Sequence, residues 1–223
     1  SDVISTPYSG MLPGRLAGWY SDREMHFNLA NLCAQAGAVF IHDAVVGLSA
    51  ARKTAALATY PPLTFDVCSV NVGISPALPP GAAGNPRVIP VKPISNLLDR
   101  WHSLLEDADE SDQPWLVAGG GAAGFEVSLA LAMAECRGNR CCNIQLLEAG
   151  PEILPGHSRA VRSRAERILK NWGITVRTST GVKKVNVQIA QLSNGADITF
   201  ERLLITTGGE GPGWFKHTDL KLS

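Results

Sequence analysis

The sequence has no excess of either charge and no long apolar run. Its 223 residues include 20 lysines and arginines and 20 aspartates and glutamates, so the formal net charge at pH 7 is +0. Such a balance gives no electrostatic reason to expect nucleic acid or an anionic membrane as a partner. No apolar stretch approaches the roughly 20 residues that a membrane-spanning helix needs, and the first residues lack the pattern of a signal peptide. We expect a cytoplasmic protein without a transmembrane segment, and whether it touches a membrane surface stays open.

Cysteine is scarce, and its spacing does not indicate a metal or redox site. No CxxC pair occurs among the five cysteines, which are Cys33, Cys68, Cys136, Cys141 and Cys142. The adjacent Cys141 and Cys142 would bond each other poorly across an ordinary trans peptide. Cysteines of cytosolic proteins are usually reduced, so we expect five free thiols. The five histidines are also scattered without ligand spacing, and we therefore predict no metal site.

The first third of the chain contains short, irregular patterns. Composition is that of an ordinary globular protein, with 45% apolar and 18% charged residues. Helical periodicity predicts a helix over Phe27–Ala36, with Gly37 as its stop. Apolar runs predict four short strands, over 38–41, 44–48, 54–58 and 65–72. The stretch from Pro76 to Pro93 is rich in proline, glycine and alanine, which predicts a linker between two lobes.

Helices and strands alternate from residue 94 onward. Apolar periodicity predicts three helices, over 94–105, 125–135 and 160–172. Short apolar runs predict four strands, over 115–118, 143–147, 174–178 and 203–206. Ser193-Asn194-Gly195 predicts a hairpin turn between the segments 184–190 and 196–200. Alternation of this kind is typical of a doubly wound α/β lobe with a parallel sheet.

A glycine-rich motif lies between the strand at 115–118 and the helix that follows it. The motif is a GxGxxG and reads Gly119-Gly120-Gly121-Ala122-Ala123-Gly124. In this context Gly119 permits a tight turn, Gly121 lets the backbone approach a pyrophosphate, and Gly124 allows close helix–strand packing. The positive end of the helix then points at the phosphates. The motif predicts a dinucleotide site, with a glycine-rich turn that holds no ligand as the alternative.

An acidic residue ends the next predicted strand. Glu148 lies at the position where a carboxylate accepts hydrogen bonds from the adenosine ribose hydroxyls. It would repel a 2′-phosphate, and no lysine or arginine follows until Arg159. These features favour NAD(H) over NADP(H), with a solvated glutamate at a strand end as the alternative interpretation.

Several segments together resemble a known family. The run from Trp115 to Glu126 resembles the NAD-binding domain of FAD-dependent pyridine nucleotide-disulfide oxidoreductases, in particular the type II NADH dehydrogenase-like branch. The segments 8–14, 91–94 and 154–158 are similar to NADH dehydrogenase-like flavoproteins found fused to selenide water dikinase. Segment 66–76 resembles the place where the chain leaves the flavin domain. The resemblance spans nearly the whole chain.

The resemblance implies a reaction and further site residues. A protein of this family passes a hydride from NADH to FAD and then electrons to an acceptor such as a quinone. Glu126 matches a glutamate that faces the nicotinamide, although the helix dipole alone also favours a glutamate in the first turn. Thr206-Thr207-Gly208 is similar to the family's ATG motif, so Thr207 and Gly208 are expected at the cofactor. The scheme needs no general base and no cysteine nucleophile, because the cofactors carry the redox chemistry.

The sequence departs from the family at both ends. It lacks the family's first GxGxxG, which holds the FAD pyrophosphate, and it stops before the family's C-terminal domain. We therefore expect an internal fragment in which FAD binding belongs to the full-length parent. The expected fold is a Rossmann-like NAD-binding lobe with a parallel sheet and a hairpin, plus a partial FAD-type α/β lobe. The expected parts are a partial FAD-like lobe over 1–80, a linker and helix over 81–110, the NAD(H) domain over 111–212 and a tail returning to the FAD-like lobe over 213–223.

Two further expectations follow from a partial lobe. Exposed sheet edges or apolar faces favour self-association, so a homo-oligomer is one expected state. The alternative to an enzyme fragment is a non-catalytic nucleotide-binding or regulatory module of a larger fusion protein. The electron acceptor is not determined by the sequence.

Overall fold

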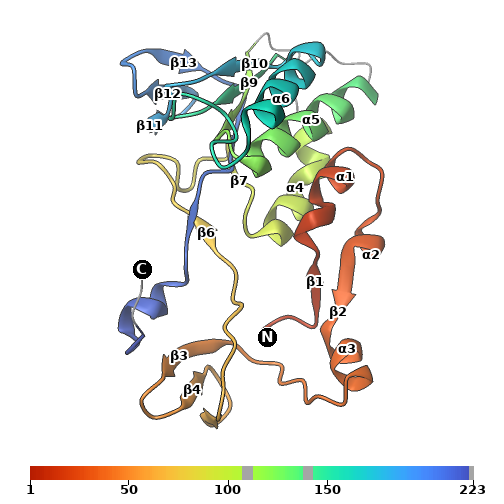
Figure 1. Cartoon of the computed structure of the whole chain (residues 1–223), viewed down its shortest axis with the longest axis vertical. Coiled ribbons are helices and arrows are strands. Elements are labelled where there is room, and N and C mark those ends of the chain that lie inside the picture. Colours follow the sequence, from red (N-terminus) through yellow and green to blue (C-terminus); the bar gives the residue numbers. More distant parts are fainter. Residues whose placement is uncertain (107–112, 138–142, 221–223) are drawn as a thin grey trace. The chain divides into compact units, whose positions relative to one another are not determined.

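The chain forms two compact units, seen in a computed structural model that describes residues 1–106, 113–137 and 143–220 (Figure 1). The larger unit comprises Ser9–Ser21 and Pro76–Gly209, and the smaller unit comprises Ser1–Tyr8, Asp22–Ser75 and Glu210–Ser223. Two short strands, β6 (Ser75–Pro76) and β15 (Gly209–Glu210), pair where the chain passes between the units. Cys141, Cys142 and most of the acidic stretch after residue 106 lie outside the described residues.

A five-stranded parallel sheet forms the centre of the larger unit. Its strands follow the spatial order β10 (Thr175–Arg177), β9 (Ile144–Leu147), β8 (Trp115–Ala118), β14 (Arg202–Ile205) and β7 (Val88–Pro90). Every residue of β8, β9 and β14 is buried, as expected for parallel strands covered on both faces. The α/β class and the parallel sheet are therefore confirmed.

The described part of the same unit contains four α-helices and the 3-10 helix η1 (Ser9–Met11) (Figure 1). The α-helices are α1 (Leu12–Leu16), α4 (Ile94–Glu106), α5 (Ala122–Arg137) and α6 (Arg159–Asn171). Helix α5 packs against β8 and β9, α6 packs against β10, and α1 packs against α5. Leu97, Leu98, Trp101 and Leu104 form the buried face of α4. Helix α6 ends one residue before its predicted end at 172, and Gly173, which follows its C-cap, has a positive φ of 71°.

The predicted hairpin is part of a three-stranded antiparallel sheet. Its strands are β11 (Val182–Asn186), β12 (Ile189–Leu192) and β13 (Asp197–Thr199). The turn at Ser193-Asn194-Gly195 joins β12 to β13 and confirms that prediction. The single segment predicted over 184–190 was wrong, because the chain reverses at Val187, whose φ is 48°, and forms two strands. Val185, Ala190 and Leu192 share a core with residues of the parallel sheet.

The predicted linker over 76–93 was partly wrong. Residues 88–90 form β7, the edge strand of the parallel sheet, in register with Leu203–Ile205 of β14. Proline and glycine surround the short apolar run of this strand, and because both residues are typical of loops, the strand was not predicted. Pro90 also suits an edge position, because a proline cannot donate a hydrogen bond to a further strand.

The smaller unit consists of short elements. Its strands are β1 (Ser5–Pro7), β2 (His26–Asn28), β3 (Val45–Ser49), β4 (Thr54–Leu57) and β5 (Leu63–Thr64). Its helices are α2 (Asp22–Met25), α3 (Leu29–Gln35) and the 3-10 helix η2 (Gly213–His217). Among the described apolar residues of this unit, only Met25 and Ala55 are buried.

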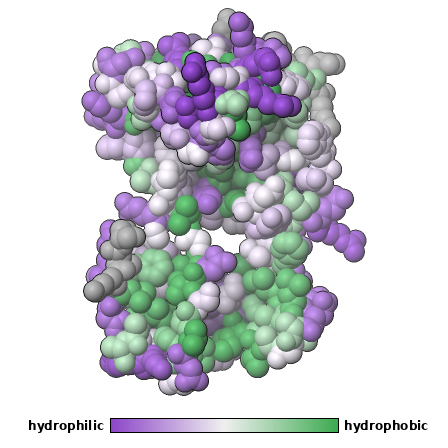
Figure 2. All heavy atoms as spheres, viewed as in Figure 1, coloured by the Kyte–Doolittle hydropathy of each residue, from purple (hydrophilic) through white to green (hydrophobic). Residues whose placement is uncertain are grey.

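Two strand predictions in the smaller unit were wrong. Segments 38–41 and 65–72 contain no strand in the described structure. Val39 is 86% exposed and Val67 is 90% exposed, so neither apolar run has a sheet surface to cover. The helix predicted over 27–36 is shorter and begins after β2. Figure 2 shows apolar residues gathered on the visible surface of this unit.

Candidate nucleotide-binding site

The glycine motif forms the turn between β8 and α5. Gly119 follows β8 with a φ of +112°, a conformation that side chains rarely allow. Its N–H donates to the Leu147 carbonyl of β9 at 2.8 Å. A Cβ on Gly119 would lie 2.9 Å from the Thr206 hydroxyl oxygen, so the turn also needs glycine for space.

Helix α5 begins three residues earlier than predicted, at Ala122 rather than Phe125. Gly124 therefore lies in the first turn of the helix. A Cβ on Gly124 would overlap the Gly119 carbonyl oxygen, which shows how closely the helix packs on the loop. The first N–H groups of a helix lack intrahelical partners, and the helix dipole makes this end positive.

Open space lies above the helix N-terminus. Gly121 is exposed, and a Cβ built on it would meet nothing within 4 Å. Ala122 and Ala123 are exposed as well and have small side chains. The three residues thus leave backbone N–H groups accessible to an anion, as the motif predicts.

Glu148 braces the loop. Its carboxylate oxygens accept hydrogen bonds from the Gly120 and Gly150 N–H groups, each at 2.6 Å. The half-buried side chain therefore ties the glycine loop to the segment after β9. A Cβ on Gly120 would lie 2.8 Å from the Glu148 Cβ. The requirement for glycine at position 120 was missed, because the motif leaves this position open.

The segment after β9 is fixed against the same loop. Leu154, buried and at a φ of 51°, donates its N–H to the Gly120 carbonyl at 2.8 Å. Arg162 of α6 donates to the His157 carbonyl at 2.7 Å and pairs with Glu152 at 3.1 Å. The segment that carries part of the family resemblance therefore supports the loop structurally.

The end of β14 completes this edge of the sheet. The Thr206 hydroxyl lies 2.9 Å from the Ala118 carbonyl oxygen and 3.1 Å from that of Gly119. This contact was not predicted from the sequence; the one feature that could have indicated it is a threonine directly after a buried strand. Thr207 and Gly208 follow and are exposed, and the Thr207 N–H group lies beside Gly119.

The structure thus brings most of the predicted residues to one place. The carboxyl ends of β8, β9 and β14 bring together the glycine motif, Glu148 and Thr207-Gly208. In open parallel sheets, ligands bind beyond the carboxyl ends of the strands. Glu126 lies farther along α5, exposed and without an ion pair among the described residues.

The chain belongs to a family of oxidoreductases that use pyridine nucleotides. Residues 15–219 match the family described as "Pyridine nucleotide-disulphide oxidoreductase". This match covers most of the chain and confirms the family resemblance.

Solved structures of related proteins have the same fold. NDH2 from Plasmodium falciparum, solved in complex with NADH, matches 97% of this chain with a TM-score of 0.80 and 17% identity. The sulfide:quinone oxidoreductase of Aquifex aeolicus matches 95% with a TM-score of 0.78 and 16% identity. Putidaredoxin reductase, in a covalent complex with putidaredoxin, matches 93% with a TM-score of 0.73 and 18% identity.

The chain spans about half the length of these structures. The matched part is 51% of the Plasmodium protein, 52% of the Aquifex protein and 51% of putidaredoxin reductase. No helix in the described part of the chain is long and apolar enough to cross a membrane.

Proposed function

We propose that the larger unit binds NAD(H) at Gly119–Gly124 and serves as the nucleotide-binding part of a flavin-dependent NADH:acceptor oxidoreductase. The observation that carries the proposal is the open space at Gly121, directly above the N-terminus of α5. Gly124 packs closely below it, so the loop is shaped for a ligand rather than for a side chain. The family match supports a pyridine nucleotide as that ligand.

In the proposed complex, the predicted site residues contact different parts of NAD(H). The backbone N–H groups at Gly121, Ala122 and Ala123 would hold the pyrophosphate with the positive helix end. Thr207 and Gly208 would line the nicotinamide side, and Glu126 would orient the ring. A bound NADH would supply a hydride, which in the proposed parent would pass to FAD and on to a quinone or another acceptor.

Glu148 would select NAD(H) over NADP(H). Its two oxygens each accept one backbone N–H group, which leaves lone pairs for the ribose hydroxyls. Because the carboxylate is fixed by these bonds, it cannot easily turn away from a 2′-phosphate. Repulsion between the two anions would weaken NADPH binding.

Calorimetric titration with NADH, NADPH and FAD tests the proposal. We expect NADH to bind more tightly than NADPH, and FAD to bind weakly or not at all. Gly121→Val should abolish NADH binding without unfolding the chain, because the added Cβ meets no protein atom. The matched control is Gly213→Val in the smaller unit, where an added Cβ also meets nothing within 4 Å.

The titrations distinguish NAD(H) from FAD as the ligand of the glycine loop. Absence of NADH binding by a folded chain would overturn the proposal. Binding of FAD that Gly121→Val removes would mean that the loop holds the other dinucleotide.

A further inference from the structure

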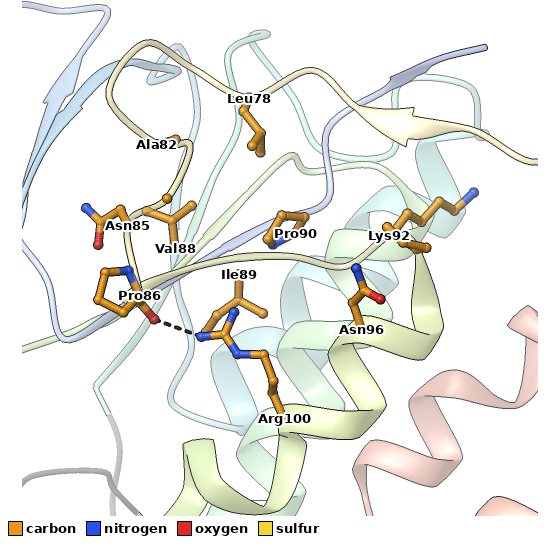
Figure 3. A pocket seen from close by; sticks show the side chains of 12 residues that line it. Leu78, Ala82, Asn85, Pro86, Val88, Ile89, Pro90, Lys92, Asn96 and Arg100 are labelled. Carbon is orange, nitrogen blue, oxygen red and sulfur yellow. Dashed lines mark hydrogen bonds between the residues drawn. The ribbon is translucent and has the colours of Figure 1, made fainter. Parts of the chain in front are cut away.

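A pocket lies beside the edge strand β7. It has a volume of about 440 Å³, which is within the roughly 300–1,000 Å³ of small-molecule sites. Its walls come from β7, the preceding loop and α4 (Figure 3). In the sheet, β14 separates β7 from β8, so the pocket is distinct from the glycine loop.

One side of the pocket is apolar. Figure 3 shows Leu78 pointing from the loop toward β7, where Val88 and Pro90 form the opposite wall. The Val88 N–H donates to the Asn85 carbonyl at 3.0 Å, and Pro90 has no N–H to offer. This strand therefore presents little hydrogen-bonding donor capacity, and the wall suits a hydrocarbon body.

The other side of the pocket carries hydrogen-bond donors. Asn96 and Arg100 are one helical turn apart on α4, and Figure 3 shows both pointing toward β7. The Arg100 Nη2 donates to the Pro86 carbonyl at 3.0 Å, which holds the guanidinium in place and leaves its other N–H groups available. Lys92, just beyond β7, adds a second positive charge to the lining.

Among the described residues, no carboxylate pairs with either of these two cations. The lining contains no aspartate or glutamate, and neither Lys92 nor Arg100 has an ion pair with a described residue. In a chain of formal net charge +0, two cations at one pocket, neither in an ion pair with a described residue, are a local excess of positive charge. A planar guanidinium fork recognises a carboxylate through paired hydrogen bonds.

We propose that this pocket binds a small organic carboxylate with a compact apolar body, held by Arg100 and Asn96 with its body against Leu78, Val88 and Pro90. Lys92 strengthens binding through its charge. A phosphate fits less well, because it has no apolar body and would leave the hydrocarbon wall exposed to water. The site is independent of the proposed nucleotide site.

Chemical-shift titration of the ¹⁵N-labelled full chain with benzoate tests this site. We expect saturable shifts at Ile89, Asn96 and their neighbours, with a Kd on the order of 1 mM or tighter. The neutral isostere benzamide should bind at least about tenfold more weakly than benzoate, because it loses the charged hydrogen bond. Inorganic phosphate should also bind at least about tenfold more weakly, because it loses the apolar contact. The shifts should be unchanged in Gly121→Val.

Matched variants locate the carboxylate. Arg100→Gln should weaken benzoate about tenfold or more, and Lys92→Gln should weaken it less. Both side chains are exposed, so both variants should fold. Arg164→Gln, on the exposed surface of α6, is the control and should bind like the unmodified chain. Equal binding of benzamide or phosphate, unsaturable shifts, or an unchanged affinity in Arg100→Gln would each overturn the proposal.

Discussion

At the scale of single residues, the four glycines around the loop differ in what they contribute. An added Cβ would overlap protein atoms at Gly124 and would meet nothing at Gly121. Gly124→Ala should therefore lower the free energy of unfolding by about 1–3 kcal/mol, because the close packing of α5 must open. Gly121→Ala should leave stability nearly unchanged and weaken NADH binding. Urea denaturation beside calorimetric titration checks both expectations, and equal destabilisation by the two variants would contradict them.

Glu148 connects stability with specificity. In Glu148→Gln, the amide oxygen can accept only one of the two N–H groups, and the amide nitrogen faces the other donor. We expect a loss of about 1–3 kcal/mol in the free energy of unfolding and a smaller preference for NADH over NADPH. Thermal melts and nucleotide titrations measure these effects. Glu152→Gln removes an exposed ion pair and should change stability far less.

The residues proposed to bind the nucleotide were easier to predict from sequence than the residues that hold the loop in place. Gly119, Gly121 and Gly124 lie within one short motif, so their spacing is visible. The contacts of Gly120 with Glu148 and of Thr206 with Gly119 join segments far apart in the chain. Only the folded sheet brings such segments together, and no local pattern indicates the pairing.

At the scale of elements, Asp43 joins two parts of the smaller unit. Its carboxylate accepts N–H bonds from Tyr60, Thr59 and Ala44. These bonds, led by that from Tyr60, lower the pKa of Asp43 to about 2. Because the folded pKa is depressed, the stabilisation is present above the unfolded pKa of about 4 and is lost as pH falls toward about 2.

The Asp43→Asn variant tests this pH dependence. At pH 7 we expect faster amide hydrogen exchange at Thr59 and Tyr60 than in the unmodified chain. The difference should shrink between about pH 4 and pH 2, as the native carboxylate becomes protonated. Asp66→Asn alters an exposed aspartate of the same unit and should have little effect at either pH. A difference that persists unchanged at pH 2 would refute the assignment.

Element prediction succeeded where burial was strong. The strands β8, β9 and β14 are buried along their whole length, so their apolar runs are unambiguous. Prediction failed for β7, because its few apolar residues are surrounded by proline and glycine. It also failed at 38–41, where Val39 stays exposed and no strand forms. An apolar run shows that a segment is able to form a buried strand, but whether it does so depends on whether the fold places another strand beside it.

At the scale of the whole molecule, the two units should respond differently to ligand. The larger unit has an extensive core, whereas the smaller unit buries few apolar residues. We expect two transitions in differential scanning calorimetry, and NADH should raise only the transition of the larger unit. At a concentration of 100 times the Kd, the expected stabilisation is about 2.7 kcal/mol. Equal shifts of both transitions would show that the units do not unfold separately.

Exposed apolar residues of the smaller unit favour association between copies. Val46, Tyr60 and Leu63 are each more than a third exposed. Apolar surface of this kind promotes self-association in water. We expect the average mass in analytical ultracentrifugation to rise with concentration, and a constant monomer mass across the range would contradict this expectation.

The larger unit is built from two separate stretches of chain, and this order matters during translation. Helix α1 leaves the ribosome before α5, against which it packs, because roughly 100 residues separate the two helices in the chain. At a synthesis rate of about 5–20 residues per second, Leu12 and Leu16, which are buried in the folded chain, stay uncovered by α5 for on the order of 5–20 s. During that interval the nascent chain exposes the apolar residues of α1 to chaperones, so the yield in cells depends on the rate of synthesis as well as on final stability.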